Sequence, residues 1–308
     1  MSQLSNIDTY DDEINLREIF FFLWKKKIFI GLITFLFAVS SIFYSLNLPN
    51  IYTSFAILAP ANNDNSLSSK AGPLPGLASF AGINLGESGT KSEEAIERIK
   101  SYDFFSKYFL PNIKLENLMA AKEWDPKDDL ITYHESEYDP IKGIWIRDVS
   151  YPKKTIPSSQ EAYEEKYKKI LNINVNKNTG FISLSISHES PMIAKQWLDI
   201  IIFNINESMR AIDKLYAENS IDYLNKTSDS TNIKSIRDVI SNLLENQMQT
   251  LMIAYSSDDY VFKIIESPIA PEKKSSPARA FICILGTIVG GLVSITIALI
   301  QFFRNSKL

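Results

Sequence analysis

Residues 28–46, IFIGLITFLFAVSSIFYSL, and residues 280–303, AFICILGTIVGGLVSITIALIQFF, carry no charged side chain. Each stretch is near or above the length of about 20 apolar residues that a helix needs to cross the hydrocarbon core of a membrane. Buried core helices are the alternative, but such helices usually present a polar face, and the polar residues here are mostly Ser, Thr and Gly. We therefore predict one transmembrane helix near each end of the chain.

The charges around the first stretch predict its orientation. Arg17 and the lysines at 25–27 precede it, and no Lys or Arg follows it before Lys70. Because basic residues favour the cytoplasmic side, residues 1–27 are expected in the cytoplasm. A long acidic lead-in and the lack of an Ala-x-Ala site after Leu46 favour a retained anchor over a cleaved signal peptide.

The charges around the second stretch are less decisive. Three basic residues precede it and two follow it, namely Lys273, Lys274 and Arg279, then Arg304 and Lys307. That local count favours the opposite orientation. We still expect residues 304–308 in the cytoplasm, because the first helix usually dominates and long loops are translocated regardless of their charge. Residues 47–279 would then lie on the far side of the membrane.

Overall charge and cysteine content set further limits. The chain has 308 residues and a formal net charge of −4, with 32 Lys and Arg against 36 Asp and Glu. This balance argues against a nucleic-acid partner, which would favour a basic face. The one cysteine, Cys283, falls inside the second apolar stretch, so no disulfide is expected within the chain.

The sequence pattern in the first part of the region 47–279 predicts strands, a loop and a helix. Residues 51–59 have the apolar alternation of a strand, and the Gly-rich and Pro-rich residues 66–89 predict a surface loop. Ser92, followed by two glutamates, predicts the start of a helix. Residues 171–187 alternate Leu, Ile and Val with Asn and Ser around the turn Lys-Asn-Thr-Gly, which is typical of an antiparallel hairpin with one buried face.

Two long apolar stripes follow this hairpin. Ser190 and Pro191 predict the start of a helix at about 191–224, and a second helix is expected at about 233–254, before a strand near 261–265. We predict an α+β fold, with a mixed α/β base near the membrane and a long protruding helical hairpin. The stripe of the first helix is longer than one partner helix needs, so we expect packing between subunits. The residues assigned to it are Trp197, Ile201 and Ile205.

A proline-rich segment lies between the last strand and the second apolar stretch. It contains Pro268, Pro271 and Pro277 and ends with the basic Arg279. The apolar stretch then carries Gly286, Gly290 and Gly291. In order and spacing, these features resemble the polysaccharide co-polymerases, the Wzz-type chain-length determinants. The N-terminal lead-in 12–27, the strand 52–60 and the start of the long helix with Ser190, Pro191, Ala194 and Trp197 are similar as well.

The resemblance implies regulation of glycan length without catalysis. Members of the family lie in the inner membrane of Gram-negative bacteria, with both termini cytoplasmic and the main domain periplasmic. They form ring-like homo-oligomers and set the length of O-antigen or related glycans, which a Wzy-type polymerase builds on a lipid carrier. The implied partners are therefore further copies of the chain, the polymerase, the lipid-linked glycan and membrane lipid. Some relatives carry a cytoplasmic kinase, but the short C-terminal tail and lack of a Walker motif predict the kinase-free kind.

The residue types themselves suggest roles for the prolines and glycines. Pro268, Pro271, Pro277 and Arg279 form a coupling segment, unless they are only a stiff spacer. Gly286 and Gly290 make a Gly-x-x-x-Gly face, which with Gly291 allows close approach of another helix. We expect this face to serve helix packing or contact with the polymerase.

Enzymatic function is the main alternative. The only histidines, His134 and His188, lack the spacing of metal ligands, and the acidic pairs are typical of solvated surface. We predict no catalytic residue, no metal and no cofactor. Trp145, near Arg147 and Asp148, is compatible with a sugar-stacking site, but a strand-edge Trp in the core is the simpler interpretation. A periplasmic sugar-binding protein, or a two-span sensor or scaffold, stays open as an alternative.

Overall fold

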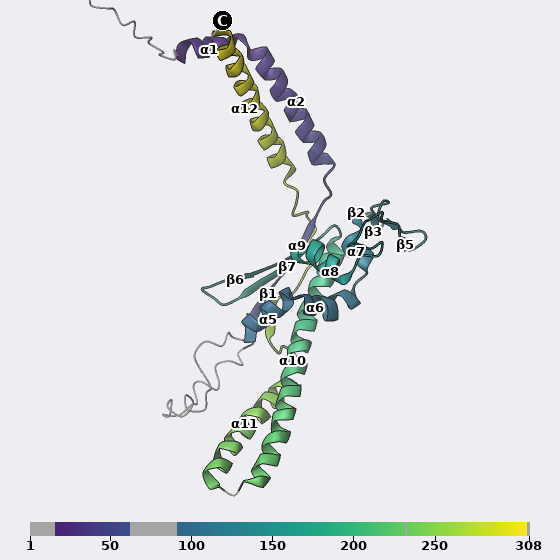
Figure 1. Cartoon of the computed structure of the whole chain (residues 1–308), viewed down its shortest axis with the longest axis vertical. Coiled ribbons are helices and arrows are strands. Elements are labelled where there is room, and N and C mark those ends of the chain that lie inside the picture. Colours follow the sequence, from purple (N-terminus) through teal and green to yellow (C-terminus); the bar gives the residue numbers. More distant parts are fainter. Residues whose placement is uncertain (1–15, 62–90, 232, 307–308) are drawn as a thin grey trace, which may run out of the picture. The chain divides into compact units, whose positions relative to one another are not determined.

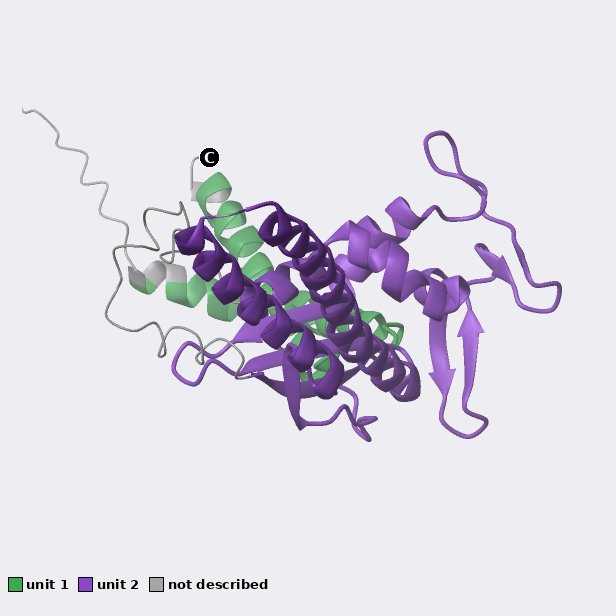
Figure 2. Cartoon of the chain, turned by 90° about the horizontal axis from the view of Figure 1, so that it is seen from below, with its two compact units in different colours: residues 1–49, 276–308 green, residues 50–275 purple. Residues whose placement is uncertain are grey.

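The computed structural model describes residues 16–61, 91–231 and 233–306. It divides the chain into two compact units, residues 1–49 with 276–308, and residues 50–275 (Figure 2). The Gly-rich stretch 66–89, predicted as a surface loop, lies outside the described residues, as do residues 1–15 and Lys307. Each unit is considered by itself.

In the unit formed by the two ends of the chain, residues 16–49 and 276–306 contain three helices. A short helix α1 (Leu16–Lys25) precedes α2 (Lys27–Leu46), and α12 (Arg279–Ser306) packs along α2 (Figure 1). Helices α2 and α12 are long and apolar enough to cross a membrane. Large apolar side chains cover their outer surfaces, including Phe35 and Leu292, which are 70% and 62% exposed. Such surfaces suit a lipid environment.

The larger unit is built on a four-stranded antiparallel sheet in the order β6-β7-β1-β8. Its strands are β6 (Leu171–Val175), β7 (Ile182–His188), β1 (Tyr52–Pro60) and β8 (Phe262–Glu266). The predicted hairpin is confirmed: β6 pairs with β7 so that Ile173 lies opposite Leu184. Gly180 closes the turn with a φ of +72°, a conformation that glycine adopts without strain.

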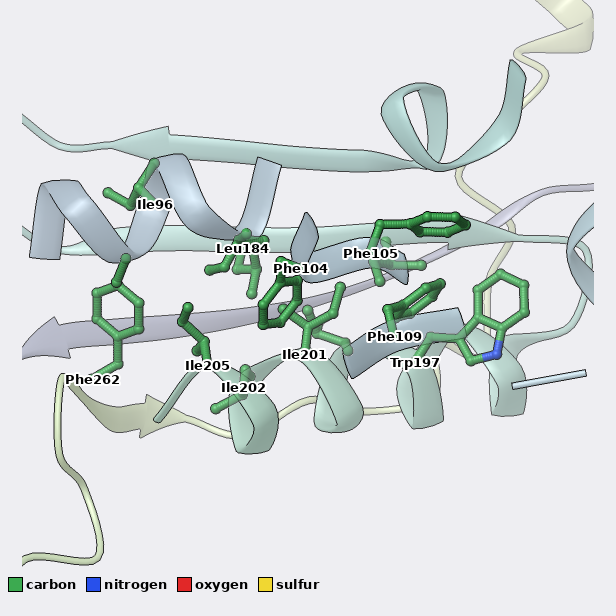
Figure 3. Close-up of a cluster of buried hydrophobic side chains, with 14 of the residues drawn as sticks. Ile96, Phe104, Phe105, Phe109, Leu184, Trp197, Ile201, Ile202, Ile205 and Phe262 are labelled. Carbon is green, nitrogen blue, oxygen red and sulfur yellow. The ribbon is translucent and has the colours of Figure 1, made fainter. Parts of the chain in front are cut away.

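The core of this unit lies between the sheet and the helices that cover it. Ala56 and Leu58 of β1 lie opposite Leu184 and Ile182 of β7, and these four residues and Ile186 are buried. The first half of α10 (Pro191–Ser230) packs on β1 and β7 (Figure 3). Because side chains alternate with period two along both strands, one face of β1 and β7 is mainly apolar, and α10 packs on this face.

Aromatic side chains fill the end of the core beside Trp197 (Figure 3). Two π-helical turns, η1 (Phe105–Phe109) and η3 (Tyr163–Tyr167), bring Phe105 and Phe109 against Tyr167, with ring centroids 4.8 and 5.0 Å apart. The Tyr167 hydroxyl donates a hydrogen bond of 2.8 Å to the carbonyl of Ile99. Burial raises the pKa of this hydroxyl, so it stays protonated as a donor.

Short elements connect these parts. Among the described residues, the remaining helical segments are α5 (Lys91–Lys100), α6 (Tyr102–Phe104), the 3-10 turn η2 (Leu110–Asn112), α7 (Leu115–Met119), α8 (Ser159–Ala162) and α9 (Lys168–Ile170). Two small hairpins are formed by β2 (Ala121–Asp125) with β3 (Leu130–Tyr133), and by β4 (Tyr138–Asp139) with β5 (Ile144–Trp145).

The far half of α10 leaves the core and pairs with α11 (Lys234–Ser256) as a helical hairpin (Figure 1). Ser190 caps α10 by accepting a hydrogen bond from the Ile193 amide, and Pro191 occupies the first turn. The helix runs 40 residues to Ser230, which is further than the predicted end near 224. The predicted α+β fold with a long protruding hairpin is confirmed.

Candidate functional site

The predicted glycine face of α12 lies against α2 within the same chain. A Cβ atom added to Gly286 would stand 2.5 Å from Ser41 Cβ, and one added to Gly290 would stand 2.5 Å from Phe37 Cβ. Further along, the hydroxyls of Ser294 and Thr34 are 3.5 Å apart. The three small residues of α12 are spaced by four, so they form one stripe along the helix, and that stripe meets α2.

Gly291 differs from its two neighbours. A Cβ atom at this position would meet nothing within 4 Å, so its surface is open. The packing role suggested for the glycine face therefore describes Gly286 and Gly290, which contact the chain's own α2. Contact with another protein stays a prediction, and of the three glycines only Gly291 offers a free surface for it.

The proline-rich segment is held against the start of β1 within the larger unit. The Ser54 hydroxyl donates to the Ile269 carbonyl at 2.8 Å. The Ser275 amide donates to the Ile51 carbonyl at 2.8 Å, and the Ser275 hydroxyl accepts from the Thr53 amide at 3.1 Å. Pro268 is buried. The part from Pro268 to Ser275 is thus hydrogen-bonded to the start of β1 near both of its ends.

The two ends of this segment have different partners. Lys274 donates to the Asn50 side chain at 3.0 Å, next to the bonds of Ser275. In the other unit, the Arg279 guanidinium donates to the Leu48 carbonyl at 3.3 Å, which joins the start of α12 to the residues after α2. Within the larger unit, hydrogen bonds thus join residues 50–53 to residues 274–275, and within the other unit they join Leu48 to Arg279. The coupling role of the segment stays a prediction.

Trp197, Ile201 and Ile205 do not form a subunit surface. Their exposed fractions are 2%, 0% and 0%, and they pack inside the domain against the sheet (Figure 3). Their assignment to oligomer packing is therefore corrected. The apolar stripe of α10 is longer than α11 requires because two different partners cover it. The chain's own sheet covers its first half, and α11 pairs with its second half.

Other large apolar side chains are exposed on the hairpin formed by the second half of α10 and by α11. Leu215 is 61% exposed and Met252 is 70% exposed. Other members of this exposed set are Ile212, Ile236, Val239 and Met248. These side chains are not part of the domain core, and they form an exposed apolar surface on both helices of the hairpin.

Two polar side chains of α10 fasten the segment that leaves the hairpin. Asn206 is buried, and its carbonyl oxygen accepts from the amides of Val261 and Phe262 at 2.8 and 2.9 Å. Asp213 accepts from the Tyr260 hydroxyl at 2.6 Å and pairs with Lys91 at 2.8 Å. Burial, with the Asp213 hydrogen bond and charge, raises the pKa of Tyr260. These residues were not predicted, because a polar residue on a helix is usually solvated.

The residues considered for catalysis are scattered. His134 is exposed, whereas His188 is buried and packs edge-on against Trp197 at 4.6 Å. His188 Nδ1 accepts from the Ser190 amide at 2.8 Å, so its other nitrogen donates to the Asn117 carbonyl at 3.0 Å. Among residues 16–61, 91–231 and 233–306, no group of His, Cys, Asp and Glu is arranged to hold a metal.

Trp145 lies in β5, at the edge of a two-stranded sheet. It is half-buried and packs against the core, and its ring lies tilted against that of Tyr138, with the centroids 5.2 Å apart. Arg147 pairs with Glu161, and both side chains are buried at 7% and 8% exposure. The arrangement agrees with the interpretation of Trp145 as a strand-edge residue of the core.

Comparison with known protein families gives a match for the N-terminal third of the chain. Residues 12–110 match the family model of Wzz, the chain length determinant protein. The predicted resemblance to this family is confirmed over these residues, which include α2, β1 and α5. No curated protein sequence matches the chain.

Two solved structures show similarity over most of the chain. One is a full-length bacterial polysaccharide co-polymerase, with 15% identity, coverage of 94% of this chain and 99% of that one, and a TM-score of 0.39. The other is a fragment of WzzB, the polysaccharide co-polymerase from Salmonella Typhimurium, with 15% identity, coverage of 74% and 100%, and a TM-score of 0.30.

Proposed function

We propose that this protein regulates the chain length of a surface polysaccharide of the O-antigen type, as a non-catalytic partner of a Wzy-type polymerase. The observation that carries this proposal is the match of residues 12–110 to the chain length determinant family. The two long apolar helices agree with a membrane location. In this proposal the polymerase forms the glycosidic bond, and the chain acts through binding and geometry.

Deletion of the gene tests this function. We expect polymer to be made still, but with scattered lengths in place of a preferred length on a glycan gel. Deletion of the polymerase serves as the control, because it should leave single repeat units. An unchanged ladder in the deletion strain would contradict the proposed function.

The proposal includes a topology. We infer that both termini are cytoplasmic and the larger unit periplasmic in a bacterial inner membrane, since Arg17 and the lysines at 25–27 precede the first apolar helix. Reporter fusions at Lys307 and at Ser228 should report opposite compartments. A cytoplasmic Ser228 would overturn this orientation.

The proposal also includes self-association. We infer that further copies of the chain cover the exposed apolar side chains of the hairpin, with Leu215 and Met252 as the most exposed of those named above. Light scattering of the full chain in detergent should show several subunits, and a Leu215→Asp/Met252→Asp variant should show fewer. A monomeric wild-type chain at micromolar concentration would contradict self-association.

A further inference from the structure

The far half of the hairpin contains a groove between its two helices. The groove has a volume of about 350 Å³ and is lined by Tyr216, Asn219, Ser220, Tyr223, Leu224, Leu243 and Gln247. Small-molecule sites in proteins fall in the range of about 300–1,000 Å³. We call this set of residues the hairpin groove.

The lining residues from α10 share one face of the helix. Tyr216 and Tyr223 are seven residues apart, which is two turns or about 10 Å along the axis. Asn219 and Ser220 lie between them, at the spacing that places side chains on the same face. From α11, Leu243 and Gln247 are four residues apart and face this stripe. The result is a row of aromatic, amide and hydroxyl groups.

The hairpin groove is chemically unusual for this chain. None of its seven lining residues carries a charge, although charged residues make up 22% of the sequence. Tyr216 and Tyr223 are 68% and 69% exposed. The exposed face of a surface helix is usually rich in charged residues, so a neutral strip with two exposed tyrosine rings is a candidate site for a ligand of matching chemistry.

The polar groups of the groove are unused within the protein. Among the described residues, the side chains of Tyr216, Asn219, Ser220, Tyr223 and Gln247 have no intramolecular hydrogen bond, ring partner or cation. Tyr255 on the same hairpin shows the contrast: its hydroxyl donates to Glu218 at 3.3 Å, and the Lys214 ammonium lies 4.2 Å from its ring. The groove therefore presents free donors and acceptors beside free aromatic faces.

We propose that the hairpin groove binds a glycan segment directly, with sugar rings stacked on Tyr216 and Tyr223. A sugar ring has an apolar C–H face and a rim of neutral hydroxyls. Tyrosine offers a flat apolar face with a polar tip, and amides offer both donors and acceptors to hydroxyls. A neutral groove with paired rings fits this ligand better than an ionic one. The proposal deepens the proposed function, on which the choice of a glycan rests.

Affinity electrophoresis tests the proposal. The full chain in lipid nanodiscs would be run in native gels containing the surface polysaccharide of the source bacterium, purified and freed of lipid. We expect the wild-type chain to be retarded, and poly-glutamate in the gel to leave its mobility unchanged. A Tyr216→Ala/Tyr223→Ala variant should lose about tenfold or more in apparent affinity, since each aromatic stacking contact contributes substantially.

Two further variants separate the site from general damage. Tyr216→Phe/Tyr223→Phe keeps both rings and should retain most of the retardation. Tyr255→Ala removes a tyrosine of similar exposure, 64%, outside the groove and should behave as the wild type. Failure of the wild-type chain to be retarded overturns the proposal. So does equal retardation of the wild type and the double alanine variant.

The test also distinguishes a glycan from a second copy of the chain. If the double alanine variant changes the oligomeric state in light scattering while its retardation is unchanged, the groove is a subunit contact and the glycan proposal fails. The gel ladder of the deletion strain is independent of these measurements. An unchanged ladder with intact retardation would remove the proposed function and leave glycan binding in place.

Discussion

Gly286 of α12 packs on Ser41 of α2 so closely that a Cβ atom at the glycine would stand 2.5 Å from Ser41 Cβ. Real Cβ contacts are essentially never this short, so a larger residue must push the helices apart. The same holds for Gly290 and Phe37. These two contacts define how the apolar helices of the chain pair.

The first prediction concerns this pairing. Replacing Gly286 and Gly290 with leucine should separate α12 from α2, whereas Gly291→Leu should not, because its Cβ meets nothing within 4 Å. The readout is a disulfide between cysteines placed at Thr34 and Ser294, whose hydroxyls are 3.5 Å apart, in a Cys283→Ser background. Oxidation should link the pair in the parent and in the Gly291 variant.

We expect the double leucine variant to form this link several times less. Equal yields in all three proteins would contradict the observed pairing. A glycan ladder from the Gly291→Leu strain adds a second measurement. A changed length distribution, with normal cross-linking, would favour contact between this open surface and the polymerase.

The second prediction concerns the domain core. Ile205 is fully buried, so Ile205→Ala should lower the free energy of unfolding by about 2–5 kcal/mol through the lost contacts and the cavity left behind. Phe203 lies on the same helix but is 66% exposed, and Phe203→Ala should change stability by about 0.5 kcal/mol or less. Thermal unfolding of the two variants measures the difference. Similar melting temperatures would contradict the placement of Ile205 in the core.

Periodicity in the sequence predicted the secondary structure of this unit but not the partners that cover it. The alternation in residues 171–187 was sufficient for the β6–β7 hairpin, because both strands and their turn are local in sequence. The apolar stripe of α10 correctly predicted a long helix. It did not say which partner covers the stripe, and Ile201 and Ile205 were assigned to a neighbouring subunit.

The order of the strands in the sheet could not be predicted from the sequence for a similar reason. Strand β1 pairs with β7 and β8, which are more than a hundred residues away, and no local pattern records such pairs. Asn206 gives no signal either, since its role depends on the amides of Val261 and Phe262 on the returning segment. For Gly286 and Gly290, spacing predicted a close helix contact but not that α2 would supply it.

The third prediction concerns the proline-rich segment. Ser275→Ala removes the acceptor for the Thr53 amide, which is otherwise bonded at 3.1 Å. Because such a bond contributes about 1 kcal/mol, the amide should exchange with solvent about fivefold faster. Hydrogen exchange of the peptide around Thr53 measures this. Ser267→Ala is the control, since Ser267 is exposed and precedes the bonded part of the segment.

The same variant tests coupling. If the segment passes the arrangement of the large domain to α12, Ser275→Ala should also shift the glycan ladder, and Ser267→Ala should not. Faster amide exchange with an unchanged glycan ladder would show that the segment acts only as a spacer. Unchanged exchange would contradict the hydrogen bond itself.

The fourth prediction concerns pH and rests on His188. Burial lowers the pKa of this imidazole, partly offset by the charge of Glu189 and by the hydrogen bond that the ring donates to Asn117. In the unfolded chain the same group has a pKa of about 6.5. Between the two values the unfolded state binds one more proton than the folded state. Stability from the neutral His188 is therefore complete above about pH 6.5 and is lost as pH falls toward the folded pKa.

Protonation would also disturb the hydrogen bonds of His188. Its Nδ1 accepts from the Ser190 amide at 2.8 Å, and Ser190 caps the start of α10. A proton on Nδ1 would place two donors against each other there.

We expect the wild type to lose at most about 1.4 kcal/mol of unfolding free energy per pH unit from this group below pH 6.5. His188→Gln should be less stable at pH 7.5 but lose less stability between pH 7.5 and pH 5.5. Melting temperatures at both pH values, with exposed His134→Gln as the control, measure this. Parallel pH dependence of the wild type and the His188 variant would show that this histidine does not titrate against folding.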